Sequence, residues 1–171
     1  MKKNIFIAIA FVVMFLQQLA AQDSAQVSAS VSRGFEASFQ GAQHVRWNSL
    51  PRKITGVQFH YRGGSWVAYF DPYGKLITSG RRIKSVNDVP LKVQAGFVRA
   101  KTRMEKKTGA MEIAIIYEML KDDVTKYYFT IQNSGTSATF SVGTDGTPIL
   151  ENKTYRSAES KPAKDVIAKK N

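Results

Sequence analysis

The feature that most constrains the fold of this chain is a series of apolar sequence patterns that occurs twice in the same order. Each set begins with an apolar stripe at helical spacing and continues with three segments of alternating apolar side chains. A turn and one more apolar segment close it. The two sets occupy about residues 31–86 and 87–152. Alternation indicates β-strands, and strands joined by short turns pair antiparallel. The order therefore predicts an internal duplication.

The first set opens with a stripe at spacings of four, four and three residues, which predicts a short helix. Its members are Val31, Phe35, Phe39 and Ala42. Val45 and Trp47 then predict a short strand, and a turn at 50–53 leads into the next one.

The strongest local pattern is a hairpin in which Gly63-Gly64 joins alternating segments at 54–62 and 65–71. A turn at these two glycines pairs Arg62 with Ser65, Tyr61 with Trp66, Phe59 with Ala68 and Val57 with Phe70. That register turns Phe59, Trp66 and Phe70 toward a core. The opposite face is mixed and carries Gln58, His60, Val67 and Tyr69.

The second set contains the clearest helix, which Asn87 or Asp88 can cap, with Pro90 in its first turn. Its stripe consists of Val93, Phe97, Ala100 and Met104, and Gly109 ends it. Alternating segments at 112–119, 124–131 and 138–142 predict three strands, and a turn at 144–147 leads to the last one at 149–150.

The two ends of the chain differ from this central domain of residues 31–152. Residues 1–21 have the layout of a secretory signal peptide, because Lys2 and Lys3 precede an apolar run at 5–16. We place cleavage after Ala21, and the alternative is a retained membrane anchor. Residues 22–30 resemble a flexible leader, and 153–171 a disordered basic tail. The mature chain is thus expected to be exported, to the periplasm or the extracellular space, without a transmembrane span.

Composition narrows the chemistry. The chain has no Cys, which excludes disulfides, thiol nucleophiles and zinc–thiolate sites. Its formal net charge is +12. An exported basic protein meets anionic lipids, polysaccharides and acidic proteins, and we expect no nucleic acid partner. A basic surface that only aids solubility is the alternative.

No residue pattern predicts catalysis, a cofactor or a metal. The two histidines, His44 and His60, lack a carboxylate or second ligand at strand or helix spacing. Asp71 and Asp145 lie in Gly-containing turns, and Asp122-Asp123 forms a hairpin turn, so these carboxylates are expected to bond local backbone amides. The sequence therefore indicates a protein that is not an enzyme, with surface or structural histidines.

Two surfaces are candidates for binding. The first is an aromatic row on the sheet face away from the helices, made of His60, Tyr69 and Tyr128. The second is a basic patch on the second helix, which Arg81, Arg82 and Lys84 can extend. It comprises Arg99, Lys101, Arg103, Lys106 and Lys107. Cross-strand packing and an ordinary solvated helix face are the respective alternatives.

Several of these patterns resemble PepSY-like, beta-lactamase-inhibitor-like exported proteins. The resemblance covers roughly residues 31–151 and rests on the Val31–Phe35–Phe39 stripe, Ala68-Tyr69-Phe70-Asp71-Pro72-Tyr73-Gly74, the helix with Pro90, and Phe140–Gly146. It implies an α+β fold of two tandem repeats, each a helix packed on an antiparallel β-sheet. It also implies a role in the cell envelope as an inhibitor or regulator of a partner, and no catalytic residue.

The chain departs from this family at Gln40, where the family often has Pro, and at Thr147-Pro148, which can shorten the last strand. The name-giving inhibitors also carry disulfides, so inhibition of a beta-lactamase is not implied. The sequence thus favours an exported, non-enzymatic module that binds an envelope protein or peptide. The alternatives are a module that binds anionic lipid headgroups or polysaccharide, and a small-molecule carrier.

Overall fold

The computed structural model describes residues 27–155, and the expected signal peptide lies outside this range. Within these residues, two helices and eight strands follow one another in the order helix, four strands, helix, four strands. Short 3₁₀ turns η2 (Pro51–Lys53) and η3 (Val86–Asp88) link them. The elements are α2 (Ala29–Ser38), β1 (Gln43–Leu50), β2 (Ile54–Tyr61), β3 (Gly64–Phe70), β4 (Leu76–Ile83), α3 (Leu91–Thr108), β5 (Glu112–Lys121), β6 (Val124–Gln132), β7 (Thr136–Val142) and β8 (Pro148–Tyr155).

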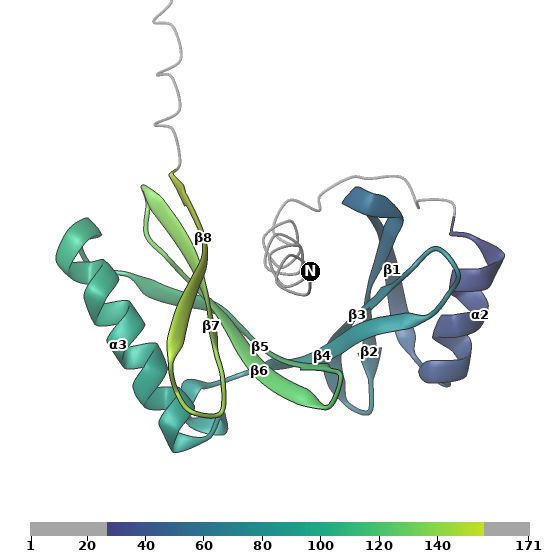
Figure 1. Cartoon of the computed structure of the whole chain (residues 1–171), viewed down its shortest axis with the longest axis horizontal. Helices are drawn as coiled ribbons and strands as arrows, with labels where there is room; N and C mark the ends of the chain where they lie inside the picture. The colour runs from purple at the N-terminus through teal and green to yellow at the C-terminus, as the bar shows by residue number, and fades with distance from the viewer. Residues whose placement is uncertain (1–26, 156–171) are drawn as a thin grey trace, which may run out of the picture.

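The eight strands form one continuous antiparallel sheet in sequence order from β1 to β8. The expected α+β architecture is therefore confirmed, and the two halves share a single sheet through pairing of β4 with β5. The sheet curves, and both helices lie on its outer side, α2 over the first half and α3 over the second (Figure 1).

The predicted stripes face the sheet, but α2 ends at Ser38, earlier than predicted, so Phe39 is its C-cap and Ala42 lies beyond the helix. Val31, Phe35 and Phe39 pack with Phe59 and Phe70 of β2 and β3. In the second half the stripe packs against β6 and β7, where Phe97 lies 4.0 Å from Phe129, centroid to centroid. Aromatic and aliphatic side chains thus fill the interior between each helix and the sheet.

The hairpin between β2 and β3 is present, but its predicted register is wrong by two residues. The structure pairs Tyr61 with Gly64, Phe59 with Trp66 and Val57 with Ala68. Arg62 and Gly63 form the turn, both with positive φ (48° and 75°), as a type I′ turn requires. A shift of two preserves the faces of a strand, so Phe59 and Phe70 are buried as expected and Trp66 packs partly buried against the same core.

Some element boundaries also differ from expectation. Neither Asn87 nor Asp88 caps α3: Asp88 belongs to η3, in a capping box with Ser85, and Pro90 directly precedes α3. Gly109 ends α3 as predicted, with φ 80°. The helix α2 begins at Ala29, inside the expected leader, and β8 continues to Tyr155, inside the expected tail.

Within residues 27–155, no helix combines the length and the apolar character that crossing a bilayer requires.

Candidate functional site

The expected exposed aromatic row is wrong in one respect, because its two tyrosines are buried. Tyr69 is 4% exposed and Tyr128 is 2% exposed, whereas His60 is exposed. All three do lie on the face away from the helices. There Tyr69 and Tyr128 pack with Val67, Tyr117 and Met119, as the second apolar cluster of the sheet. The alternating sequence pattern predicts which face of the sheet a residue occupies. It does not predict whether the aromatic side chains on that face are buried.

The tyrosine hydroxyls of this cluster lie in an apolar environment. The Tyr69 hydroxyl has no hydrogen-bond partner, and burial raises the pKa of Tyr69 far above its usual value. Burial, together with the charge of Glu151, raises the pKa of Tyr128 to about 12. These groups are neutral at physiological pH, and they stabilise the sheet by packing.

The polar end of the same face brings together the two histidines. The rings of His44 on β1 and His60 on β2 lie 5.2 Å apart, centroid to centroid, nearly perpendicular to each other. A register shift between Gln43 and Arg46 marks a β-bulge in β1, and His44 takes a positive φ of 52° within it. Bulges re-aim side chains and often occur beside functional sites.

Two arginines complete this end of the sheet. Arg46 lies opposite Gln58 in the β1–β2 pair, and Arg82 lies opposite Tyr117 in the β4–β5 pair. Arg82 and Tyr117 line the same hollow; burial raises the pKa of Tyr117, and the positive charge of Arg82 opposes that rise. We call His44, Arg46, His60 and Arg82 the basic cluster.

The basic cluster lines an open pocket of about 370 Å³. The other lining residues are Gln58, Phe59, Ser65, Trp66 and Tyr117. A second pocket of about 460 Å³ adjoins it and shares His60, Ser65 and Arg82. No carboxylate from the part of the chain that the structure describes lines either pocket. Among residues 27–155, neither Arg46 nor Arg82 forms an ion pair. The site is therefore a solvent-accessible, positively charged hollow with hydrogen-bond donors on the five strands β1 to β5.

Arg81 and Arg82 of β4, which the sequence suggests as extensions of the basic patch on α3, lie on opposite faces of the sheet. Arg81 forms an ion pair with Glu118 of β5, which also accepts a hydrogen bond from the Tyr127 hydroxyl. Arg82 is its sequence neighbour in the strand and points to the opposite face. The expectation that Arg81 and Arg82 extend one field is therefore wrong.

Two of the five residues in the expected basic patch on α3 form contacts within the domain. Arg99 donates to the Gly146 carbonyl at 2.7 Å, and the Lys101 ammonium pairs with Glu105. Arg103, Lys106 and Lys107 are exposed. Three of the five predicted residues thus remain as a solvent-facing group near the C-terminal end of α3.

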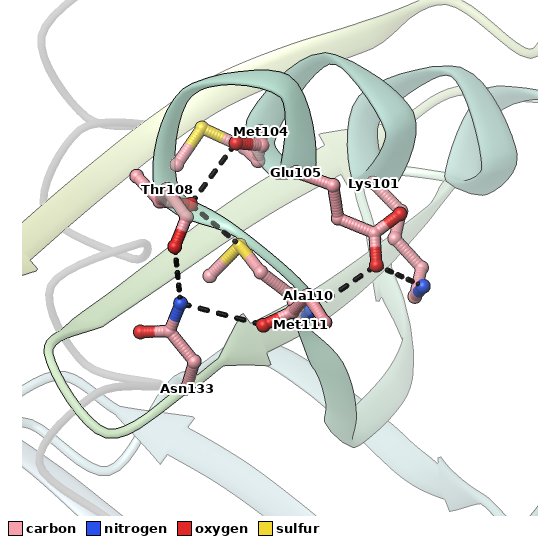
Figure 2. Close-up of polar contacts among 7 residues, drawn as sticks. All are labelled: Lys101, Met104, Glu105, Thr108, Ala110, Met111 and Asn133. Atoms are coloured by element: carbon pink, nitrogen blue, oxygen red, sulfur yellow. Dashed lines mark hydrogen bonds and ion pairs between the residues drawn. The ribbon is translucent and has the colours of Figure 1, made fainter.

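Polar contacts hold that end of α3 onto the sheet (Figure 2). The Asn133 side-chain amide donates to the Thr108 carbonyl at 2.9 Å and to the Ala110 carbonyl at 3.4 Å. The Glu105 carboxylate accepts from Lys101 and from the Met111 backbone N–H, and these bonds lower the pKa of Glu105. The final helix carbonyls therefore gain partners that the helix itself cannot supply.

The aspartates have the expected turn roles. The Asp71 carboxylate accepts from the backbone N–H groups of Tyr73 and Lys75, both at 2.9 Å. The Asp145 carboxylate accepts from the Thr147 N–H, which lowers the pKa of Asp145. Asp122 and Asp123 take the positive φ of a tight hairpin turn. No group of three or more potential metal-ligating side chains occurs in the described part of the chain.

Sequence reasoning missed the basic cluster. His44, His60 and Arg82 belong to three different strands, and only the register joins them. The bulge that brings His44 to His60 has no signature in the sequence. The one available signal was that His60 and Arg82 both occupy the face away from the helices.

Comparison with known proteins shows the fold. Among solved structures, a BLIP-like protein from Bacteroides fragilis matches at TM-score 0.57 and 12% identity, over 78% of this chain and 90% of that chain. A candidate periplasmic protein from Bacteroides eggerthii matches at TM-score 0.61 and 10% identity, over 75% and 88%. A DUF2874 family protein from Bacteroides ovatus matches at TM-score 0.58 and 12% identity, over 79% and 89%.

The fold of this chain is therefore BLIP-like, as the sequence resemblance implied. No protein-family model matches the sequence, and no curated protein matches it. At these identities the shared architecture carries no site residue from those proteins to this one.

Proposed function

We propose that this protein is an exported, non-enzymatic binding module that contacts an envelope protein or peptide with the sheet face away from its helices. One observation carries the proposal: both helices lie on the outer side of a curved sheet (Figure 1), which leaves the other face uncovered by them. That face ends in an open hollow lined by the basic cluster. The BLIP-like fold of one solved relative and the periplasmic description of another support it.

Site-specific photo-crosslinking tests the proposal in cells that produce the full chain. A crosslinker replaces His60 in one variant and Lys106 in a matched variant, since both positions are exposed but lie on opposite sides of the sheet. We expect position 60 to trap a discrete envelope protein and position 106 to trap none. Trapping from position 106 alone would contradict the proposed face.

Export itself is tested separately. The apolar run at 5–16 and Ala21 support cleavage after Ala21. N-terminal sequencing of the protein recovered outside the cytoplasm should therefore begin at Gln22. Recovery of material that still begins at Met1 would contradict processing.

Binding to anionic envelope components is the second candidate function. The exposed group of Arg103, Lys106 and Lys107 and the net charge of +12 favour it. Adsorption to a charged lipid surface weakens within a Debye length and falls with salt. Co-sedimentation with anionic vesicles that is lost in 0.5 M salt and in a Lys106→Gln/Lys107→Gln variant would support this function. The filled interior between helices and sheet disfavours the carrier alternative.

We also propose that the two halves derive from one duplicated unit. In both halves a helix glycine packs against a turn glycine of the same half, Gly34 against Gly74 and Gly96 against Gly146. This contact needs a helix and a turn at matching places, which supports common descent of the halves.

A further inference from the structure

We infer that the hollow lined by His44, Arg46, His60 and Arg82 is a binding site for a single oxyanion group, such as a carboxylate, sulfate or phosphate. This inference goes beyond the proposed function, because it assigns a ligand chemistry to specific side chains and needs no partner protein to test it.

The charge of the hollow is the first reason. It brings together two guanidinium groups and two imidazoles from three strands, β1, β2 and β4, and no carboxylate of residues 27–155 lines the pocket. Among the described residues, no acidic side chain pairs with either arginine. Guanidinium groups offer forked N–H donors that match planar and tetrahedral oxyanions. An anion is thus the ligand that would supply the negative charge that these arginines lack as a partner.

The arrangement of the histidines is the second reason. The bulge in β1 and the positive φ of His44 bring its ring to 5.2 Å from that of His60. A left-handed conformation is uncommon outside glycine, and such residues cluster at ligand sites. An imidazole that gains a proton here adds positive charge beside the arginines, and an anion bound in the hollow next to the ring pair would offset the resulting repulsion.

Proton uptake is therefore linked to anion binding. A histidine ordinarily gains its charge between pH 8 and pH 5. The groups that face the ring pair are Arg46 of β1, Gln58 of β2, Ser65 of β3, Arg82 of β4 and Tyr117 of β5, and Lys84 lines the adjoining pocket. None of them is an acid that could take the place of the anion. Anion binding should strengthen as the pH falls.

The test is an NMR titration of the purified protein with sodium sulfate, sodium phosphate and sodium acetate at constant ionic strength, with sodium chloride as the reference. We expect saturable shifts of the His44 and His60 ring signals with at least one oxyanion. Binding should tighten at least about threefold from pH 7.5 to pH 5.5, the range in which histidine charges. Preference for acetate identifies a carboxylate site, such as one for an acidic side chain, and preference for sulfate or phosphate identifies a tetrahedral-anion site.

Matched variants locate the site. Arg82→Gln should weaken oxyanion binding about fivefold, the effect of one solvent-exposed charge contact. Arg103→Gln makes the same charge change on α3 and should leave the affinity unchanged. Amide spectra establish that each variant is folded. Equal shifts with chloride and oxyanions, or equal affinity of the Arg82→Gln variant and the unchanged protein, would overturn the inference. Neither result would bear on the crosslinking test of the proposed function.

Discussion

Gly96 of α3 lies so close to Gly146, in the turn between β7 and β8, that a Cβ atom on Gly96 would overlap the Gly146 carbonyl group. Gly146 in turn takes a φ of 82° and lies against the Lys92 carbonyl of the same helix. The same turn carbonyl accepts the hydrogen bond from Arg99. The helix therefore contacts the turn through backbone, and the absence of a side chain sets the distance between them.

Replacing Gly96 by alanine should destabilise the protein. Helix propensity alone favours alanine by about 0.5–1 kcal/mol. Overlap with a backbone carbonyl costs more, about 1–3 kcal/mol for an overpacked contact. We expect a net loss of about 1–2 kcal/mol in a urea unfolding experiment. Gly135→Ala is the control, because an added Cβ there has free space and should have little effect. A gain in stability for Gly96→Ala would contradict the close approach.

The buried hydroxyl of Tyr69 leads to a second prediction. Tyr69→Phe removes a polar group that has no partner, so it should leave stability unchanged or raise it by about 1 kcal/mol. Tyr69→Ala should cost about 3–5 kcal/mol, as for other large buried aromatics. Phe70→Ala, on the opposite face of the strand, should cost a similar amount. Denaturant melts measure all three, and a strongly destabilised Tyr69→Phe variant would mean that the hydroxyl has a partner.

The tyrosine cluster should also determine stability at high pH. The pKa of Tyr128 is raised to about 12 in the folded protein, whereas a tyrosine in the unfolded chain ionises near 10. The unfolded chain thus binds fewer protons than the folded protein above pH 10, and stability falls as the pH rises from 10 toward 12. Thermal melts between pH 8 and pH 12 should show this decline. It should be shallower in Tyr128→Phe, and an unchanged slope would contradict the prediction.

The attachment of α3 at its C-terminal end can be tested at Asn133 (Figure 2). Asn133→Asp keeps the acceptor oxygen that bonds the Gly135 and Thr136 N–H groups, but it loses the donors to the Thr108 and Ala110 carbonyls. It also places a negative charge near the negative end of the helix dipole. We expect a loss of about 1–2 kcal/mol in urea. Ser134→Ala, at the exposed neighbouring position, should change stability by less than about 0.5 kcal/mol.

Arg99 should differ from the other cations of α3. Its hydrogen bond to the Gly146 carbonyl joins the helix to the turn, so Arg99→Gln should cost about 0.5–1.5 kcal/mol. Arg103→Gln, an exposed change on the same helix, should lie within about 0.5 kcal/mol of the unchanged protein. Equal values in thermal or urea melts would show that the Arg99 contact contributes nothing.

Much of the fold could be predicted from the sequence because side chains alternate along a strand, so every second residue lies on the same face of the sheet. The predicted hairpin register was two residues out, yet Phe59 and Phe70 were assigned to the correct face. The helix stripes could be predicted for a similar reason, since Val93, Phe97, Ala100 and Met104 repeat at helical spacing. Turn geometry is harder to predict: the turn lies one residue nearer the N-terminus, at Arg62-Gly63 and not at Gly63-Gly64, and the sequence gives no sign that Arg62 takes a positive φ.

The candidate site could be predicted only in part because it depends on contacts between strands. His60 was assigned to the correct face, but its neighbour His44 reaches it through a bulge that alternation cannot reveal. The burial of Tyr69 and Tyr128 depends on the second apolar cluster, which assembles side chains from several strands. The sequence suggests that the Arg99 side chain is unpaired, because its partner, the Gly146 carbonyl, is 47 residues away in sequence.

The second apolar cluster joins the two halves of the molecule. The core under α2 lies within the first half, and the core under α3 takes only Ile83 and Val86 from that half. The second apolar cluster combines Val67 and Tyr69 of β3 with Tyr117, Met119 and Tyr128 of β5 and β6. Opening either half would expose apolar surface of the other, so the halves should melt in one cooperative transition. An anion that binds between β1 and β4 would then slow hydrogen exchange in β6, across the boundary between the halves. Because the shared cluster spans both halves, we expect a ligand bound at one end of the sheet to raise the free energy of unfolding of the whole domain.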